Sequence, residues 1–134
     1  MTGSRAGRRG STMLEGALVM TTFVILLVGV MDFGRLGYTY SSVTYAAHQA
    51  ARFAATNGSA SGHAASAATI QANAKGNMVG LNASDLTVAV SWNPNNNPGS
   101  QVQVVVSYGF QPLVVPISST SLTLKSTAVD IITQ

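Results

Sequence analysis

The apolar residues are spaced differently in the first, middle and last parts of the chain. Residues 16–31 form a run of 16 positions without a charged side chain, GALVMTTFVILLVGVM. With three preceding residues added, a helix over 13–31 spans about 28 Å, close to the hydrocarbon thickness of a bilayer. The hydroxyls of Thr21 and Thr22 can bond back to the helix backbone, so they are compatible with lipid. The run therefore predicts a membrane-spanning helix.

A helical period continues beyond this run. No proline interrupts residues 32–56, and Asp32 and Arg35 are spaced i, i+3, so they can pair where the helix leaves lipid. Asn57-Gly58 is expected to end the helix in a left-handed conformation. These features predict one continuous helix from Thr12 to Thr56, about 65–70 Å long. Its apolar positions recur in steps of three and four: Leu36, Tyr40, Val43, Ala47, Ala51 and Ala54.

Two glycines interrupt the side-chain pattern of this helix. Gly34 and Gly37 each cost a helix about 1 kcal/mol relative to alanine. We expect the helix to be weakest there, and a bend at these positions is compatible with the sequence.

The remaining residues predict a short helix followed by strands. An alanine-rich segment favours a helix from Ala64 to Val79, and its thin apolar stripe must lean on the long helix or on a sheet. A period of two then predicts strands over 86–92, 102–110 and 121–132, with less regular alternation in the last one. A turn cluster rich in Asn, Pro and Gly separates the first two strands, and a loop containing Pro112 and Pro116 separates the second from the third. The stripe of the short helix consists of Ile70, Ala74, Met78 and Leu81.

These elements predict an α+β protein. A long N-terminal transmembrane and stalk helix carries a head made of a short second helix and a small three-stranded antiparallel sheet. The economical arrangement places the alanine-rich helix on the apolar face of the sheet. The domain boundaries are a basic leader over 1–10, the transmembrane and stalk helix over 11–57, and an extracytoplasmic head over 58–134.

The charges are few and unevenly placed. Charged residues make up 8% of the chain, whose net charge is +3 at pH 7. Three of the basic residues, Arg5, Arg8 and Arg9, precede the apolar run, and the remaining four basic residues balance the four acidic ones. This balance leaves no basic face for a nucleic acid. Arginines before the span place the N-terminus in the cytoplasm and the head outside.

Glu15 distinguishes this segment from an ordinary signal peptide or anchor. No small-residue cleavage motif follows the apolar run, as a removable signal requires. An ionised carboxylate at the start of a span costs free energy unless it has a partner. Two simpler interpretations stay open: Glu15 as an interfacial acid beside Arg8 and Arg9, and Gly10 as an unprocessed loop glycine.

Arg8-Arg9-Gly10, followed by Ser11 and by Glu15 four residues later, resembles the class III leader of type IV prepilins. The resemblance implies that a prepilin peptidase cuts after Gly10 on the cytoplasmic side and often methylates the new amine of Ser11. Glu15 then becomes the fifth residue of the mature chain. The amine of a neighbouring subunit can supply its counter-charge as helices pack together.

Residues 8–55 resemble the TadE-like family of pilus-assembly proteins. The shared features are Gly10, Glu15, the apolar run, the step Asp32-Phe33-Gly34-Arg35, and the segment Ala50-Ala51-Arg52 in an alanine-rich helix. Members often carry a tyrosine after the glutamate, where this chain has Gly16. The resemblance implies three kinds of partner besides the membrane: the peptidase, other pilin subunits (self or a major pilin), and the inner-membrane assembly platform.

Candidate catalytic residues are sparse. His48 and His63 are isolated and read as solvated side chains, and Asp85 and Asp130 read as surface or strand-edge residues. There is no cysteine, no phosphate-binding loop, no zinc motif and no nucleophile elbow. We therefore expect no enzyme activity, no metal and no cofactor.

Two functions remain. The first is a structural pilin-like subunit, a minor pilin or pseudopilin, that leaves the bacterial cytoplasmic membrane for a surface filament. The alternative is a single-pass membrane-anchored envelope protein whose extracytoplasmic head binds a partner. Gly10 together with Glu15 favours the first, because a plain anchor needs neither.

Overall fold

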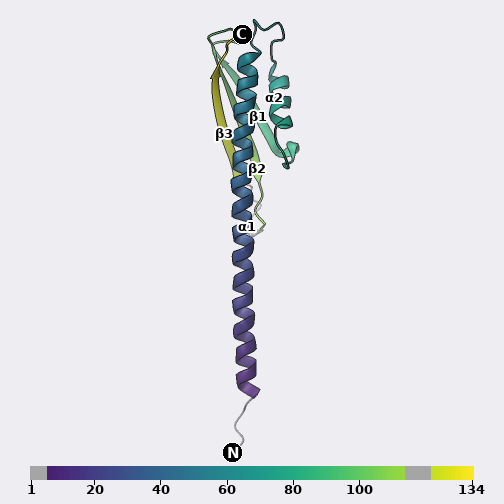
Figure 1. The fold of residues 1–134 in the computed structure, drawn as a ribbon, viewed down its shortest axis with the longest axis vertical. Helices are drawn as coiled ribbons and strands as arrows, with labels where there is room; N and C mark the ends of the chain where they lie inside the picture. Colours follow the sequence, from purple (N-terminus) through teal and green to yellow (C-terminus); the bar gives the residue numbers. More distant parts are fainter. Residues whose placement is uncertain (1–5, 114–121) are drawn as a thin grey trace, which may run out of the picture.

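The computed structural model describes residues 6–113 and 122–134 and has one very long helix. Helix α1 covers Ala6–Thr56, 51 residues in all, and runs without a break from the N-terminal end of the molecule to the top of the head (Figure 1). It continues through Gly34 and Gly37 as helix. It also begins earlier than the predicted Thr12, because the arginines and alanine of the leader are good helix formers and no proline breaks the helix there.

The head consists of the upper half of α1, a short helix and three strands. Helix α2 covers Ala67–Gly76, and a short 3-10 helix, η1, covers Ala83–Asp85. The strands form one antiparallel sheet in the order β1-β2-β3. The predicted α+β class and antiparallel sheet are confirmed, and position 121 of the predicted third strand lies outside the described residues. The strand bounds are β1 (Leu86–Asn93), β2 (Gln101–Phe110) and β3 (Leu122–Ile131).

Helix α2 is shorter than the predicted range of Ala64 to Val79. The Ser66 hydroxyl caps its N-terminus by accepting a hydrogen bond of 3.2 Å from the backbone N–H of Thr69. At the other end, the Asn77 side chain donates to the Asn73 carbonyl at 2.9 Å. Such caps favour helix ends at these positions over continued helix.

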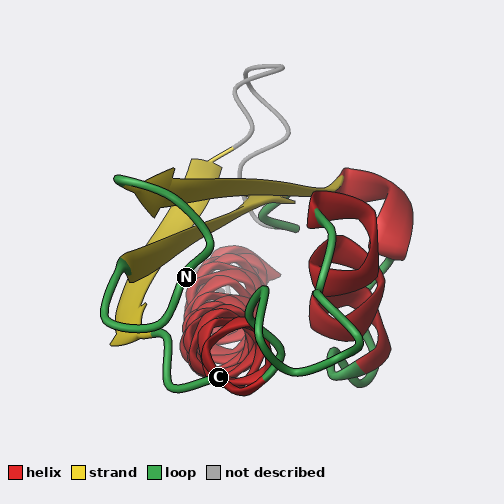
Figure 2. Ribbon diagram, turned by 90° about the horizontal axis from the view of Figure 1, so that it is seen from above, coloured by secondary structure: helices red, strands yellow, loops and turns green. Residues whose placement is uncertain are grey.

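The apolar face of the sheet packs mainly on α1. The even-numbered residues of β2 are all buried, and the strand register places Val88 and Ala128 on the same buried face. Helix α1 covers β2 and β3, whereas α2 packs against α1 and β1 (Figure 2). The expected packing of the alanine-rich second helix on the sheet is therefore limited to β1. Helix α1 covers the rest, because it carries the larger set of small buried side chains.

The buried face of α1 is made almost entirely of alanine. Tyr40, expected in this stripe, is 52% exposed. Steps of three and four drift around a helix, and the Tyr40 ring lies outside the face that meets the sheet. The residues of the buried face, none more than 3% exposed, are Val43, Ala46, Ala47, Ala50, Ala51, Ala54 and Ala55.

The C-terminus closes the head against the end of α1. Thr133 donates its backbone N–H to the Ala55 carbonyl at 2.9 Å. A Cβ at Gly58 would collide with the Gln134 carbonyl oxygen and the Ile132 side chain. Glycine is required at position 58 because two chain segments approach closely.

The expected left-handed conformation at Gly58 is absent. The positive-φ glycines among the described residues are Gly62, Gly80 and Gly99. The helix end at Thr56 is stabilised instead by Asn57, whose side chain donates to the Phe53 carbonyl at 2.9 Å. This bond satisfies a carbonyl of the last turn.

Candidate functional site

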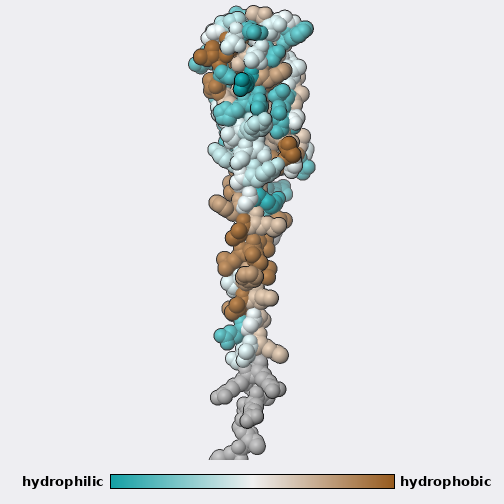
Figure 3. Space-filling view, in the orientation of Figure 1, coloured by the Kyte–Doolittle hydropathy of each residue, from teal (hydrophilic) through white to brown (hydrophobic). Residues whose placement is uncertain are grey.

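The lower part of α1 is an apolar rod with no cover. Over residues 10–31 every side chain is exposed or only partly covered by the subunit, and Figure 3 shows a brown band below the head. Its large side chains include Leu18 (70% exposed), Phe23 (54%) and Met31 (65%). The helix is long and apolar enough to cross a membrane.

The two threonines within the rod do not disturb its apolar surface. Thr21 and Thr22 donate their hydroxyl protons to the carbonyls of Ala17 and Leu18, one turn earlier, at 2.8 and 2.9 Å. The predicted bonds back to the helix are therefore confirmed, and both hydroxyls have a partner without water.

The predicted processing and charge-pairing residues lie at the lower end of the rod. Gly10, Ser11 and Glu15 are exposed on α1, and Ser11 and Glu15 are one turn apart on the same face. Arg8 and Arg9 belong to the same helix. Gly10 is therefore a helical residue and not a loop glycine.

Glu15 makes no ion pair within the part of the chain that the structure describes. A Cβ placed at Gly10 or at Gly16 would meet nothing within 4 Å. Neither glycine is therefore required by packing inside the subunit. Any role of Gly10 or Glu15 in binding depends on contacts with another molecule.

The step between span and head is built around Asp32 and Arg35. The predicted ion pair is present, with Arg35 Nη1 2.9 Å from Asp32 Oδ1. The other carboxylate oxygen of Asp32 accepts a hydrogen bond of 2.7 Å from the backbone N–H of Leu113, 81 residues away. Asp32 is thus buried (8% exposed) and ties the base of the head to the helix. A role for this pair at the membrane exit stays a prediction.

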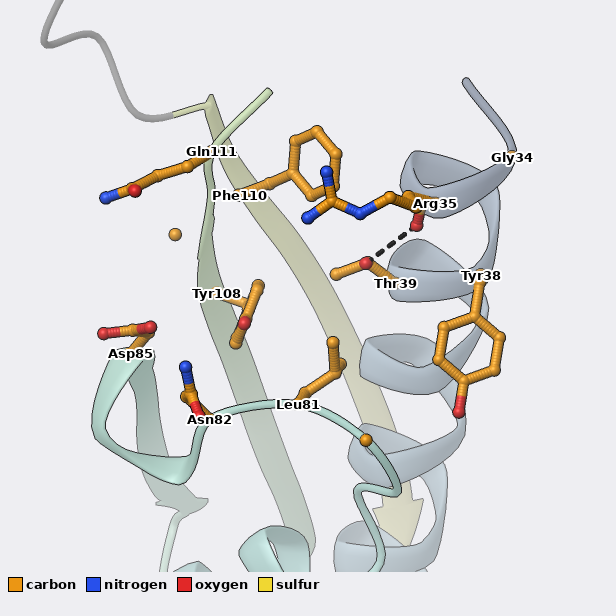
Figure 4. Close-up of a pocket in the computed structure, with 12 residues that line it drawn as sticks. Gly34, Arg35, Tyr38, Thr39, Leu81, Asn82, Asp85, Tyr108, Phe110 and Gln111 are labelled. Carbon is orange, nitrogen blue, oxygen red and sulfur yellow. Dashed lines mark hydrogen bonds between the residues drawn. The ribbon is translucent and has the colours of Figure 1, made fainter. Parts of the chain in front are cut away.

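An open groove of about 550 Å³ lies directly beside this step. One wall is the α1 turn over 34–39. The others are the loop over 80–82 with Asp85, and the end of β2 with Gln111 (Figure 4). Three segments that are distant along the chain therefore meet at the base of the head.

The loop wall of the groove is fastened to α1. The Tyr38 hydroxyl donates to the Val79 carbonyl at 2.8 Å. Gly80 follows with φ +74°, a conformation that favours glycine. The loop therefore turns sharply directly after its contact with the long helix.

Arg35 is held in this groove by two contacts. Besides its pair with Asp32, its guanidinium carbon lies 5.5 Å from the centroid of the Phe110 ring, within the range of a cation–π contact. Its side chain is still 45% exposed. No single segment of the chain contains this groove, so no short-range pattern in the sequence indicates it.

The remaining candidate residues lie apart from one another. His48, His63, Asp85 and Asp130 are all exposed, and the solvated state predicted for the two histidines is confirmed. Among residues 6–113 and 122–134, no three His, Asp or Glu side chains gather in a way that could hold a metal ion.

A known protein family matches part of the long helix α1. Residues 10–52 match the family model described as "TadE-like protein". This segment is TadE-like. The resemblance drawn from Gly10, Glu15 and the Asp32–Arg35 step is thereby confirmed, and the match begins at Gly10 and ends within α1. No curated protein and no solved structure matched the chain.

The TadE-like match and the bare apolar helix together indicate a membrane-anchored protein associated with the Tad pilus. This association implies contact with the membrane and with other pilus components. The match does not extend into α2 or the sheet.

Proposed function

We propose that this protein is a pilin-like subunit, a minor pilin or pseudopilin, of a Tad-type or related type IV pilus. A prepilin peptidase would cut it after Gly10, and it would assemble through the lower half of α1. One observation carries the proposal: the apolar rod of residues 10–31, which lies within the TadE-like segment, is left uncovered by the subunit, whereas the head has its own buried core. In this role the protein is a structural subunit and not an enzyme.

The energetics of the rod support assembly. Burying one large apolar side chain is worth about 1.5–3 kcal/mol, and the rod carries many that the subunit itself leaves exposed. Lipid covers them while the subunit is in the cytoplasmic membrane, and neighbouring helices would cover them in a surface filament. The basic leader supports an N-terminus in the cytoplasm and a head outside.

Glu15 has a place in this proposal. Its carboxylate lies at the lower end of the rod and has no ion-pair partner among the described residues. The amine of Ser11 that cleavage creates on a neighbouring subunit would supply the counter-charge. Pairing removes an uncompensated charge from an apolar bundle, which would otherwise be costly.

The first experiment is mass spectrometry of the N-terminal peptide from membrane and sheared-surface fractions. A terminus at Ser11, methylated or not, in both fractions supports a processed filament subunit. A terminus at Met1 or Thr2, found in membranes only, supports the alternative of an anchored envelope protein with a binding head, which the groove beside Arg35 would serve.

The matched variants are Gly10→Ala and Gly16→Ala. Both sites are open space within the subunit, so neither methyl group disturbs packing. We expect Gly10→Ala to remain as uncut precursor and Gly16→Ala to be cut normally, as measured by the mass of the N-terminal peptide. Normal cleavage of Gly10→Ala would refute the leader assignment.

A second pair of variants tests assembly. We expect Glu15→Ala to be cut but to reach the sheared fraction at a several-fold lower level, because the incoming amine has lost its counter-charge. Asp130→Asn, at an exposed carboxylate in the head, serves as the control. Wild-type assembly of Glu15→Ala would remove Glu15 from the mechanism.

A further inference from the structure

The groove beside Arg35 lies at the height of lipid headgroups when α1 spans a membrane. Met31 ends the charge-free run, and Gly34 is the first α1 residue that lines the groove. Three residues of helix rise about 4.5 Å. The headgroup region of one leaflet is roughly 5–7 Å thick, so the lower rim of the groove falls within it.

The groove presents one cation and one anion on opposite walls (Figure 4). Arg35 comes from α1, and Asp85 comes from the end of η1. They do not pair with each other in the described chain, where the ion pair of Arg35 is with Asp32. The exposed carboxylate of Asp85 has only a long contact, 3.4 Å, from the Ser84 hydroxyl.

The cation is positioned before any ligand arrives. Asp32 fixes one nitrogen of the guanidinium, and the ring of Phe110 lies against it. A guanidinium has five N–H donors, and the hydrogen bond from Nη1 to Asp32 uses only part of this set. Planar donors that are held in place suit an oxyanion such as a phosphodiester.

The balance of charge selects among phospholipids. Asp32 already compensates Arg35, so Asp32, Arg35 and Asp85 together carry a formal charge of −1, which disfavours a purely anionic headgroup. The carboxylate of Asp85, which lines the groove, offers acceptors for a primary ammonium. A quaternary ammonium has no N–H to donate to them.

We propose that this groove binds the headgroup of phosphatidylethanolamine from the leaflet that surrounds the top of the span. Arg35 binds the phosphodiester, and Asp85 binds the ammonium. Two exposed apolar side chains at the lower rim of the groove, Phe33 (77% exposed) and Leu113 (61% exposed), contact the part of the lipid below its headgroup. The site would orient the head on the membrane before assembly. The inference rests on the proposed anchoring with the head outside the cytoplasm.

Lipid retention by the full-length protein tests the site. The purified protein in detergent is given an equimolar mixture of phosphatidylethanolamine, phosphatidylcholine and phosphatidylglycerol with identical acyl chains, and bound lipid is counted by native mass spectrometry. We expect wild type to retain phosphatidylethanolamine about tenfold over the other two, the effect of one hydrogen bond to a charged group.

Two variants and two controls locate the binding. Asp85→Asn should abolish the preference over phosphatidylcholine, and Arg35→Gln should lower retention of all three lipids. Asp85 is exposed, so Asp85→Asn is not expected to disturb folding. It therefore tests the site even if Arg35→Gln destabilises the helix. Asp130→Asn and Lys125→Gln change exposed charges that do not line the groove, and should bind lipid as wild type does.

Two results would overturn the proposal. They are equal retention of the three lipids by wild type and an unchanged preference for phosphatidylethanolamine in Asp85→Asn. The assay requires neither cleavage nor a filament. A failure of the pilin proposal is therefore detected in the N-terminal peptide and the sheared fraction, whereas a failure of the lipid site is detected in the lipid-retention assay.

Discussion

The two halves of α1 belong to one helix but have opposite surfaces. Residues 10–31 carry large apolar side chains that the subunit leaves bare, such as Leu18 at 70% exposure. In the upper half the side chains that face the sheet are small and fully covered, such as Ala47 at 0%. Large side chains are placed where the partner is another molecule, and small ones where the chain packs on itself.

This difference follows from packing geometry. Alanines let a helix approach a sheet closely, and the valines of β2 fill the space between them. The lower half has no sheet to approach, so large side chains maximise contact with lipid or with other helices. The comparison predicts that equal substitutions in the two halves have unequal effects on the head.

The largest expected difference in the stability of the head is between substitutions of two isoleucines. Ile70 of α2 belongs to the core that includes the upper half of α1 and is fully buried, whereas Ile25 of the lower half is 56% exposed. Ile70→Ala should lower the free energy of unfolding of the head by about 2–5 kcal/mol. Ile25→Ala should leave it unchanged. Thermal unfolding in detergent, followed by near-UV circular dichroism, measures both, and equal losses would contradict the contrast between the packed core of the head and the bare lower half of α1.

A smaller difference is expected between two alanines enlarged to leucine. Ala47→Leu inserts a side chain into a filled core and should destabilise the head by about 1–3 kcal/mol. Ala17 is exposed in the span, so Ala17→Leu should not change the melting temperature of the head. If Ala47→Leu is tolerated as well as Ala17→Leu, the sheet does not lie as close to α1 as the structure places it.

The elements of this fold could be predicted from residue periodicity, but their packing could not. Apolar steps of three and four marked α1, and alternation marked the strands. The alanine stripe of α1 has a weak hydrophobic signal, so nothing local identified it as the main cover of the sheet. Gly58 was expected to supply a left-handed turn, whereas its role depends on the distant Gln134.

In the candidate site, too, the contacts within one helix could be predicted from the sequence and the contacts between segments could not. The Asp32–Arg35 pair could be predicted because both residues lie on one helix, one turn apart. The bond from Leu113 to Asp32 joins positions 81 residues apart, and the groove needs three segments to meet. Such contacts depend on tertiary structure, and no short-range pattern encodes them.

The smallest effect concerns the junction between the two halves. Gly37 lies in continuous helix, and a Cβ there would meet nothing within 4 Å. Gly37→Ala should therefore stabilise the protein by about 0.5–1 kcal/mol, the gain in helix propensity. The measurement is a rise of a few degrees in the melting temperature of the head, with Gly16→Ala in the lower half as a control that leaves it unchanged. A fall in melting temperature for Gly37→Ala would mean that glycine there adopts a conformation closed to alanine, so that the two halves are joined by a bend and not by one straight helix.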